Sequence, residues 1–171
     1  MKTTRLLLPF MHGVDMHAID AALRLAKGYE AILVPLSLID LPEDGRAKGA
    51  RLEHIQQSKD FLEAVKHKAA RYGVPLERLE VYTSDVAQSI RAIASEMECE
   101  GILLFVESKH DVLLSMGEIK RLMEHMTCKL YILRLQADDG RSFKRVLRER
   151  FSHRLLARPK QKDELLQVQN W

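Results

Sequence analysis

Residues 101–135 read GILLFVESKHDVLLSMGEIKRLMEHMTCKLYILRL, and this stretch decides the fold. Two continuous apolar runs, Ile102–Val106 and Leu130–Leu135, flank a polar loop and a short stretch with helical periodicity. An apolar run without alternation is typical of a strand that is covered on both faces. Strand, helix and strand in succession form a βαβ unit. In open α/β sheets ligands bind at the loop that follows such a strand, here Glu107–Ser115.

The same alternation of strand and helix runs through the preceding hundred residues. The sequence predicts strands at Arg5–Phe10, Ala31–Ile39 and Leu79–Thr83, and helices at Met16–Lys27, Arg51–Arg71, Val86–Cys99 and Gly117–Met126. Crossovers between parallel strands are almost always right-handed. We therefore predict an α/β fold, a doubly wound open sheet of about five parallel strands in the order 3-2-1-4-5, with helices on both faces.

Proline, glycine and aspartate mark where these elements begin and end. Pro9 has no N–H to donate, which predicts a strand end or an edge-like bend. Asp15 is placed to cap the first helix, and Gly28 is a natural stop for it. Ser84 or Asp85 is expected to cap the third helix, and Gly73 followed by Pro75 is expected to end the second.

Composition and charge describe a globular domain with a basic appendage. The chain of 171 residues is 46% hydrophobic and 30% charged, and no apolar run is long enough for a membrane span. The net charge is −1 over residues 1–135 and +4 over residues 136–171. The two cysteines, Cys99 and Cys128, form no CxxC pair, so we expect reduced thiols that are buried or half-buried and a cytoplasmic protein, with a redox or metal role as the alternative.

The basic C-terminal extension, residues 136–171, is expected to carry an amphipathic helix from Ser142 to about Ala157. Its apolar face would pack on the domain or on a second subunit, and the alternative is that the extension binds an acidic protein partner. No nucleic-acid motif is visible, so we expect no nucleic-acid partner.

The last strand of the domain, Leu130–Leu135, is predicted to form an edge of the sheet with unpaired backbone groups. It is long and apolar for an exposed sheet edge, which otherwise promotes aggregation. Pairing of this edge across a two-fold axis predicts a homodimer, with Leu130, Ile132, Leu133 and Leu135 at the dimer edge.

The predicted strand order places a crevice between the first and fourth strands. One wall is Met11–Asp15 and the other is Glu107–Ser115. The candidate ligand-binding residues are Met11, His12, Gly13, Asp15, Ser37, Glu107, Ser108, Lys109, Ser115 and Gly117. Glu107 and Asp111, together with His12, could act as an acid–base set on a small polar ligand; a solvated loop that carries these charges is the plainer interpretation.

Motifs for other chemistry are missing from the sequence. It contains no HExxH, GxSxG or GxxxxGK[ST] pattern. His12, His17 and His110 could approach one another and bind a metal, but histidines at the rim of the crevice without a metal are the interpretation that we adopt.

Three segments together resemble the universal stress protein family. They are RLLLPF with ALRLAK (residues 5–10 and 22–27), RYGVP (71–75) and RLMEHMTCKLYIL (121–133), where His125 and Cys128 stand in register with the family pattern. The resemblance covers about residues 4–135. Members of this family commonly dimerise through the last strand, and many bind ATP.

The resemblance also implies where nucleotide binding would occur. The family's ATP marker, Gly-x2-Gly-x9-Gly-Ser/Thr, follows the fourth strand, but Val106–Gly117 has no glycine before Gly117. The family's Asp-Gly-Ser turn corresponds to Met11–Gly13. We therefore expect a non-catalytic, dimeric regulatory or stress-response protein without the usual ATP binding and without another cofactor. The alternatives are an atypical nucleotide binder and a small-molecule enzyme.

Overall fold

The structure is a computed structural model that describes residues 3–41, 51–107, 110–125 and 128–135, and the backbone of 147–150. Its elements are β1 (Arg5–Phe10), α1 (Met16–Gly28), β2 (Ile32–Asp40), α2 (Leu52–Tyr72), β3 (Leu79–Thr83), α3 (Val86–Glu96), β4 (Gly101–Val106), α4 (Met116–Glu124), β5 (Lys129–Arg134) and β6 (Leu147–Arg150).

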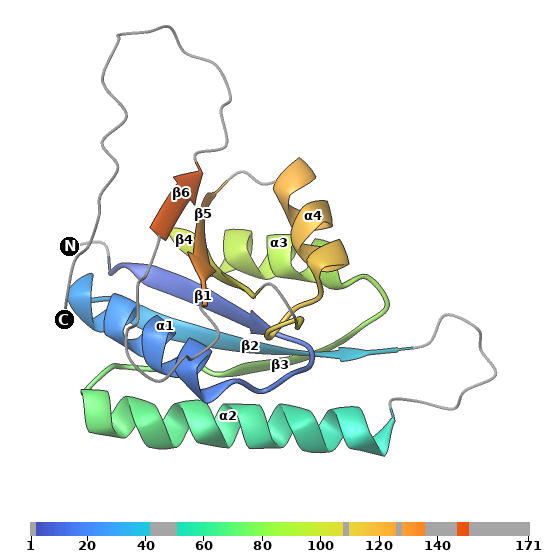
Figure 1. The fold of residues 1–171 in the computed structure, drawn as a ribbon, viewed down its shortest axis with the longest axis horizontal. Helices are drawn as coiled ribbons and strands as arrows, with labels where there is room; N and C mark the ends of the chain where they lie inside the picture. Colours follow the sequence, from blue (N-terminus) through green and yellow to red (C-terminus); the bar gives the residue numbers. More distant parts are fainter. Residues whose placement is uncertain (1–2, 42–50, 108–109, 126–127, 136–146, 151–171) are drawn as a thin grey trace, which may run out of the picture.

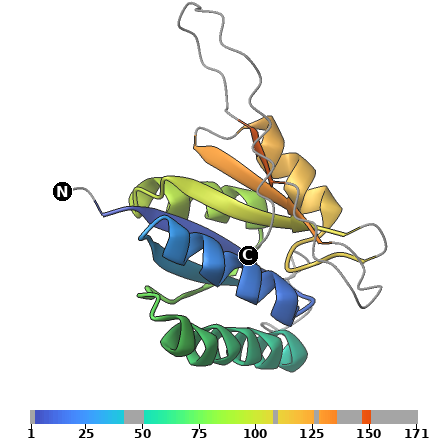
Figure 2. The same cartoon turned by 60° about the vertical axis from the view of Figure 1, so that its left-hand side comes forward.

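The sheet has the predicted topology with one addition. Over the described residues its order is β3-β2-β1-β4-β5-β6, in which β1 to β5 are parallel and β6 is antiparallel to β5. The predicted order 3-2-1-4-5 of the parallel strands is confirmed. Helices α1 and α2 cover one face and α3 and α4 the other, as the two views of the ribbon show (Figures 1 and 2).

The apolar strands are buried on both faces, as their lack of alternation predicted. In β1, Leu6, Leu8 and Phe10 face the core under α1 and α2, while Leu7 faces the core under α3 and α4. The ring of Phe10 stacks on Phe61 of α2, with centroids 4.2 Å apart. The two cores hold the sheet between the two helical layers.

Pro9 lies in a central strand, so the predicted edge-like bend is wrong. Backbone groups alternate in direction along a strand, and the carbonyl of Arg5 accepts a hydrogen bond from the N–H of Glu100 beside β4. Pro9, four residues later, therefore faces β4 as well. The β1–β4 pairing ends at Leu7 and Ile102, so the missing N–H falls beyond the ladder, at the predicted strand end.

Helix α1 ends at Gly28, as predicted, but the left-handed residue that terminates it is not this glycine. The helix is capped by Tyr29, and Glu30 adopts the left-handed conformation with φ +50°. The N–H of Ala31 then bonds the carbonyl of Ala26 at 2.8 Å. The end of α2 is as predicted, because Gly73 has φ +66° and its N–H bonds the carbonyl of Ala69.

Residues 147–150 are extended, so the predicted helix from Ser142 to Ala157 is wrong at these positions. They form β6, in which Leu147 pairs with Leu133 and Arg150 with Leu130. The outer side of β5 carries free N–H and C=O groups, and an extended segment satisfies them where a helix cannot. The sheet edge that we assigned to a dimer is thus covered by this chain itself. The other residues of the predicted helix lie outside the described residues.

Candidate functional site

The two walls of the predicted crevice meet at the carboxyl ends of β1 and β4. The loop after β4 lies against the loop after β1 (Figure 1). The N–H groups of Met11 and His12 both donate to the carbonyl of Leu113, at 2.7 and 3.3 Å, and the N–H of Leu113 donates to the carbonyl of Gly13 at 3.4 Å. The backbone of one wall is therefore hydrogen-bonded to the backbone of the other.

The segment that makes this contact is Val112–Leu114, which we call the plug. The N–H of Leu114 donates to the carbonyl of Val112 at 2.7 Å, and Leu113 between them has φ +62°. This is a three-residue turn of the rare, strained kind. The three side chains are no more than 4% exposed. Val112 and Leu113 join the core under α1 and α2, and Leu114 joins the core under α3 and α4.

Sequence reasoning missed the plug, because it treated Glu107–Ser115 as a polar ligand loop. The available signal was the run Val112-Leu113-Leu114 itself, which is three apolar residues in a row inside a charged loop. An apolar run of this kind needs cover, and the top of the sheet between β1 and β4 supplies it. The side chains of Val112, Leu113 and Leu114 are therefore buried in the two cores at the carboxyl ends of β1 and β4.

Gly13 is the residue that lets the plug come so close. It has φ +72°, a conformation that glycine adopts without steric cost. A Cβ at this position would lie 3.0 Å from the carbonyl oxygen of Asp111. The predicted tight turn at Gly13 is confirmed, and the close approach to Asp111 is the reason for it.

Three of the polar candidates are engaged at helix N-termini. Asp15 accepts a hydrogen bond from the N–H of Ala18 at 2.8 Å, which confirms its predicted capping role. Ser115 caps α4 through the N–H of Glu118 at 3.2 Å, and Asp111 accepts from the N–H of Met116, also at 3.2 Å. A helix N-terminus attracts phosphate through such free N–H groups. In α4 two of them already bond the protein's own side chains.

The remaining candidates differ in their surroundings. Met11, His12 and Glu107 are half-buried, and Gly117 is exposed in the first turn of α4. Ser37 is fully buried, and its hydroxyl has no hydrogen-bond partner among the described residues. Ser108 and Lys109 lie outside the described residues. The structure therefore brings the two walls together, but over the residues that it describes it keeps Ser37 away from the surface.

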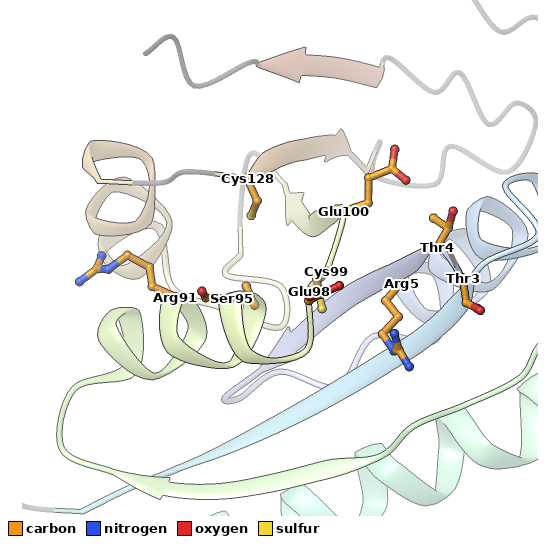
Figure 3. A pocket seen from close by; sticks show the side chains of 10 residues that line it. Thr3, Thr4, Arg5, Arg91, Ser95, Glu98, Cys99, Glu100 and Cys128 are labelled. Atoms are coloured by element: carbon orange, nitrogen blue, oxygen red, sulfur yellow. The ribbon is translucent and has the colours of Figure 1, made fainter. Parts of the chain in front are cut away.

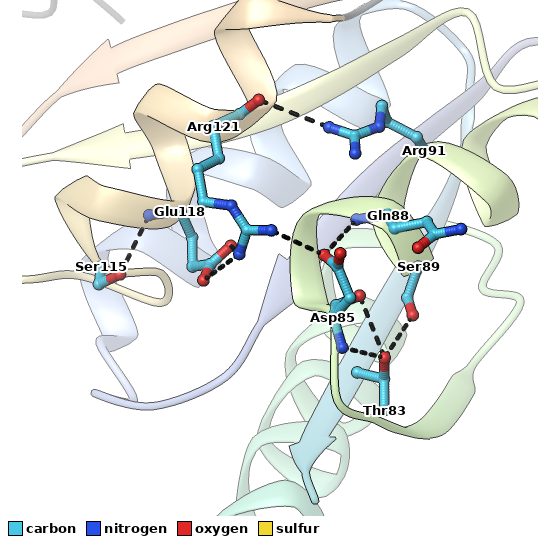
Figure 4. Close-up of polar contacts among 8 residues, drawn as sticks. All are labelled: Thr83, Asp85, Gln88, Ser89, Arg91, Ser115, Glu118 and Arg121. Atoms are coloured by element: carbon cyan, nitrogen blue, oxygen red, sulfur yellow. Dashed lines mark hydrogen bonds and ion pairs between the residues drawn. The ribbon is translucent and has the colours of Figure 1, made fainter. Parts of the chain in front are cut away.

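A second polar cluster lies near the crevice and links α3 to α4 (Figure 4). The guanidinium of Arg121 reaches Asp85 at 3.1 Å and Glu118 at 3.3 Å, and Arg91 donates to the carbonyl of Arg121. Asp85 also caps α3 through the N–H of Gln88 at 3.0 Å. Arg121 and Asp85 are 51% and 39% exposed, so their ion pair contributes roughly 0.5 kcal/mol. The sequence-based reasoning did not pair these residues, because they are 36 positions apart.

Neither a cluster of metal ligands nor a membrane-spanning helix occurs in the part of the chain that the structure describes. No three His, Cys, Asp or Glu side chains in that part of the chain lie close enough together to hold a metal ion. Within the same residues, no helix is both long and apolar enough to cross a bilayer.

Solved structures with the same fold include bacterial and archaeal proteins. A universal stress family protein from Burkholderia pseudomallei is 23% identical, with a TM-score of 0.53 over 74% of this chain and 93% of that one. A universal stress protein from Archaeoglobus fulgidus is 16% identical, with a TM-score of 0.60 over 77% and 94%. Another, from the same organism in complex with dAMP, is 12% identical, with a TM-score of 0.57 over 77% and 97%.

Sequence comparison decides the family. A search of curated proteins found no match. The model of the universal stress protein family, however, matches residues 4–134, which include every parallel strand of the sheet and the helices between them. The strand order of the parallel sheet agrees with that match. The chain belongs to the universal stress protein family.

Proposed function

We propose that this chain is a regulatory, non-catalytic universal stress protein in which the plug takes the place of a bound nucleotide. The observation that carries the proposal is the set of backbone hydrogen bonds between Leu113 and Met11, His12 and Gly13, made over a buried Val112–Leu114 segment. A protein without an open ligand site transmits a signal through its surface, which is why we expect a partner protein and no substrate.

The cost of removing the plug supports this view. Exposing a buried Val or Leu side chain costs about 2 kcal/mol, so displacing three of them costs roughly 5 kcal/mol after some cover by the ligand. A closed state of that stability lowers the apparent affinity of any crevice ligand by between three and four orders of magnitude, because about 1.4 kcal/mol corresponds to a factor of ten. A nucleotide with ordinary micromolar affinity for the open crevice would then bind in the millimolar range.

Electrostatics supports the same conclusion. Glu107 and Asp111 flank the crevice with negative charge, and the oxygens of Ser115 and Asp111 accept hydrogen bonds from the first turn of α4. A triphosphate at this position would meet carboxylates where a phosphate site offers free N–H groups.

Calorimetric titration of the protein with ATP and Mg²⁺ tests the proposal. We expect no binding at micromolar concentrations. Micromolar binding would contradict the proposal and support the alternative, an atypical nucleotide-binding stress protein, for which the dAMP complex of the A. fulgidus relative is the precedent. In that case Gly13→Ala and Ser115→Ala should abolish binding, and Gly28→Ala, at a glycine with open space around it, should leave it unchanged.

The enzyme alternative is tested by comparing the activity of the wild-type protein with that of a double variant. A small-molecule activity that uses Glu107, Asp111 and His12 would be lost in the double variant Glu107→Gln, Asp111→Asn. The Asp111 carboxylate already accepts a hydrogen bond from Met116, which favours a structural role for this residue.

We further propose that the protein is a cytoplasmic homodimer, without a cofactor and without nucleic acid, whose basic extension contacts an acidic partner.

Light scattering of the full chain tests the dimer. Because β6 already pairs with β5, the half-buried Ile132 shows whether β5 takes part. A halved mass for a folded Ile132→Asp variant would place the interface at β5, and an unchanged mass would place it elsewhere.

A further inference from the structure

A cavity of about 360 Å³ lies at the opposite end of the sheet from the plug. It is lined by the residues through which the chain enters β1, β4 and β5, among them Arg5, Glu98, Glu100 and both cysteines, Cys99 and Cys128 (Figure 3). These are the only cysteines in the sequence, and they are 29 positions apart in it. The fold therefore brings both thiols of the chain to one cavity.

The pairing of β4 with β5 explains why the two cysteines line the same cavity. Gly101 is the partner of Lys129 in the parallel ladder, and neighbouring strands lie about 4.8 Å apart. Cys99 precedes Gly101 by two positions, and Cys128 directly precedes Lys129. Both cysteines pack into the core under α3 and α4. The N–H of Cys99 bonds the carbonyl of Ala94 at 2.8 Å, which holds this turn against α3.

The pKa of the Cys99 thiol reflects both its burial and the nearby Cys128. Burial raises the pKa of the Cys99 thiol to about 11, and the negative charge of a Cys128 thiolate contributes to this rise. Burial also raises the pKa of Cys128. Both groups are therefore neutral thiols near pH 7. Cys128 is the more exposed of the two, so it is the one that a reagent in the cavity reaches first.

We propose that Cys99 and Cys128 form a redox pair, which a small disulfide such as oxidised glutathione converts into an intramolecular disulfide. Cys128 first loses its proton to solvent, and the resulting thiolate attacks the small disulfide, forms a mixed disulfide and expels one small thiolate, which takes up a proton. Cys99 then loses its proton to solvent, attacks the sulfur of Cys128 and expels the second small thiol. Two protein thiols are oxidised, and one small disulfide is reduced to two thiols.

The bond would join the turn after α3 to the turn before β5. It would close the chain segment that contains β4 and α4, and so lock the pairing of β4 with β5 at its amino-terminal end. This redox site is separate from the crevice, and it does not depend on whether a nucleotide binds there.

The test is a redox equilibrium of the full chain in glutathione buffers at pH 8. Aliquots are quenched with acid, alkylated and weighed by mass spectrometry, once under native conditions and once in urea. We expect the native product to carry no alkyl group and to be about 2 Da lighter than the reduced chain before alkylation. Its digest should contain a peptide that links Cys99 to Cys128. The effective concentration of the two thiols should be at least about tenfold higher in the native protein than in urea, because the fold holds them together.

Several results would overturn the proposal. One is an effective concentration in the native protein that equals or falls below the value in urea, because the fold would then hold the thiols apart. Another is a native product that consists only of mixed disulfides or of cross-linked chains.

Cys99→Ser and Cys128→Ser, tested singly, should stop at the mixed disulfide with glutathione. The comparison of native protein with urea uses the wild-type chain, so it remains decisive if either variant fails to fold.

Discussion

Single residues determine how closely the plug approaches the loop after β1, and Gly13 is the first of them. Its φ of +72° and its 3.0 Å approach to Asp111 leave no comfortable place for a side chain. We expect Gly13→Ala to lower the free energy of unfolding by about 2 kcal/mol. Urea denaturation followed by circular dichroism measures this difference.

A matched glycine provides the control for Gly13. Gly28 lies in the last turn of α1 with no positive φ, and nothing lies within 4 Å of the place that a methyl group would take. There alanine should stabilise the protein by about 0.5 kcal/mol through its higher helix propensity. Equal losses at both glycines would show that the approach of the plug to Gly13 does not matter.

Ser37 is a second residue whose setting predicts a measurable effect. Its hydroxyl is buried without a hydrogen-bond partner among the described residues, and such a group costs about 1 kcal/mol or more. Ser37→Ala should therefore raise the free energy of unfolding by about 1 kcal/mol.

The control for Ser37 is another buried serine. The hydroxyl of Ser58 donates to the carboxylate of Glu80 at 2.5 Å, so Ser58→Ala should lower the free energy of unfolding by about 1 kcal/mol. Opposite signs for the two variants, measured by thermal and urea unfolding, are the expected outcome. A loss at Ser37 would indicate that its hydroxyl has a partner in solution.

At the scale of elements, the packing of β4 on β5 depends on Gly101. A Cβ there would overlap the ring of Tyr131, and that ring is only 2% exposed and cannot swing away. Gly101→Ala should cost about 3 kcal/mol, because either the ring or the strand must move. Chemical denaturation with tyrosine fluorescence as the second probe measures the loss.

The element-scale control is Gly117 in the first turn of α4. A Cβ there meets only the Ser115 hydroxyl, at an ordinary contact distance of 3.7 Å. Gly117→Ala should leave stability within about 0.5 kcal/mol of wild type. If Gly101→Ala changes the free energy of unfolding as little as Gly117→Ala does, then β4 or the Tyr131 ring can shift to accommodate a methyl group, which would contradict the prediction.

The whole molecule has a plugged end and an end with a cavity, and the cavity end makes stability depend on pH. The pKa of Cys99 is raised from 9.0 to about 11 in the folded protein, mainly by burial. The folded state thus keeps a proton that the unfolded state loses. This contribution is complete below pH 9 and disappears as the pH rises toward 11.

The expected size of this effect is about 2 to 3 kcal/mol, because each pKa unit is worth about 1.4 kcal/mol. The free energy of unfolding of wild type should fall between pH 9 and 11 by that much more than for Cys99→Ala, which removes the titrating group. Parallel pH profiles for the two proteins would contradict the burial of the Cys99 thiol.

Much of the architecture could be predicted from local patterns. The apolar runs located the parallel strands to within a residue or two, because a strand buried on both faces has no polar alternation. Asp15, Asp85 and Gly73 marked helix ends, because capping is a local interaction. The alternation of strands and helices, together with right-handed crossovers, predicted a doubly wound sheet, and its expected strand order 3-2-1-4-5 is the one observed.

Only the tertiary structure decided the features that depend on contacts between segments far apart in the sequence. Leu113 adopts a strained turn because Met11, His12 and Gly13 bond its backbone and two cores receive its neighbours. Residues 147–150 have helical periodicity but are extended, because β5 offers them an open ladder. Cys99 and Cys128 share a cavity because β4 pairs with β5. The sequence by itself therefore determined the scaffold and the family, since both rest on local patterns, whereas contacts between distant segments decided how the two walls of the crevice join.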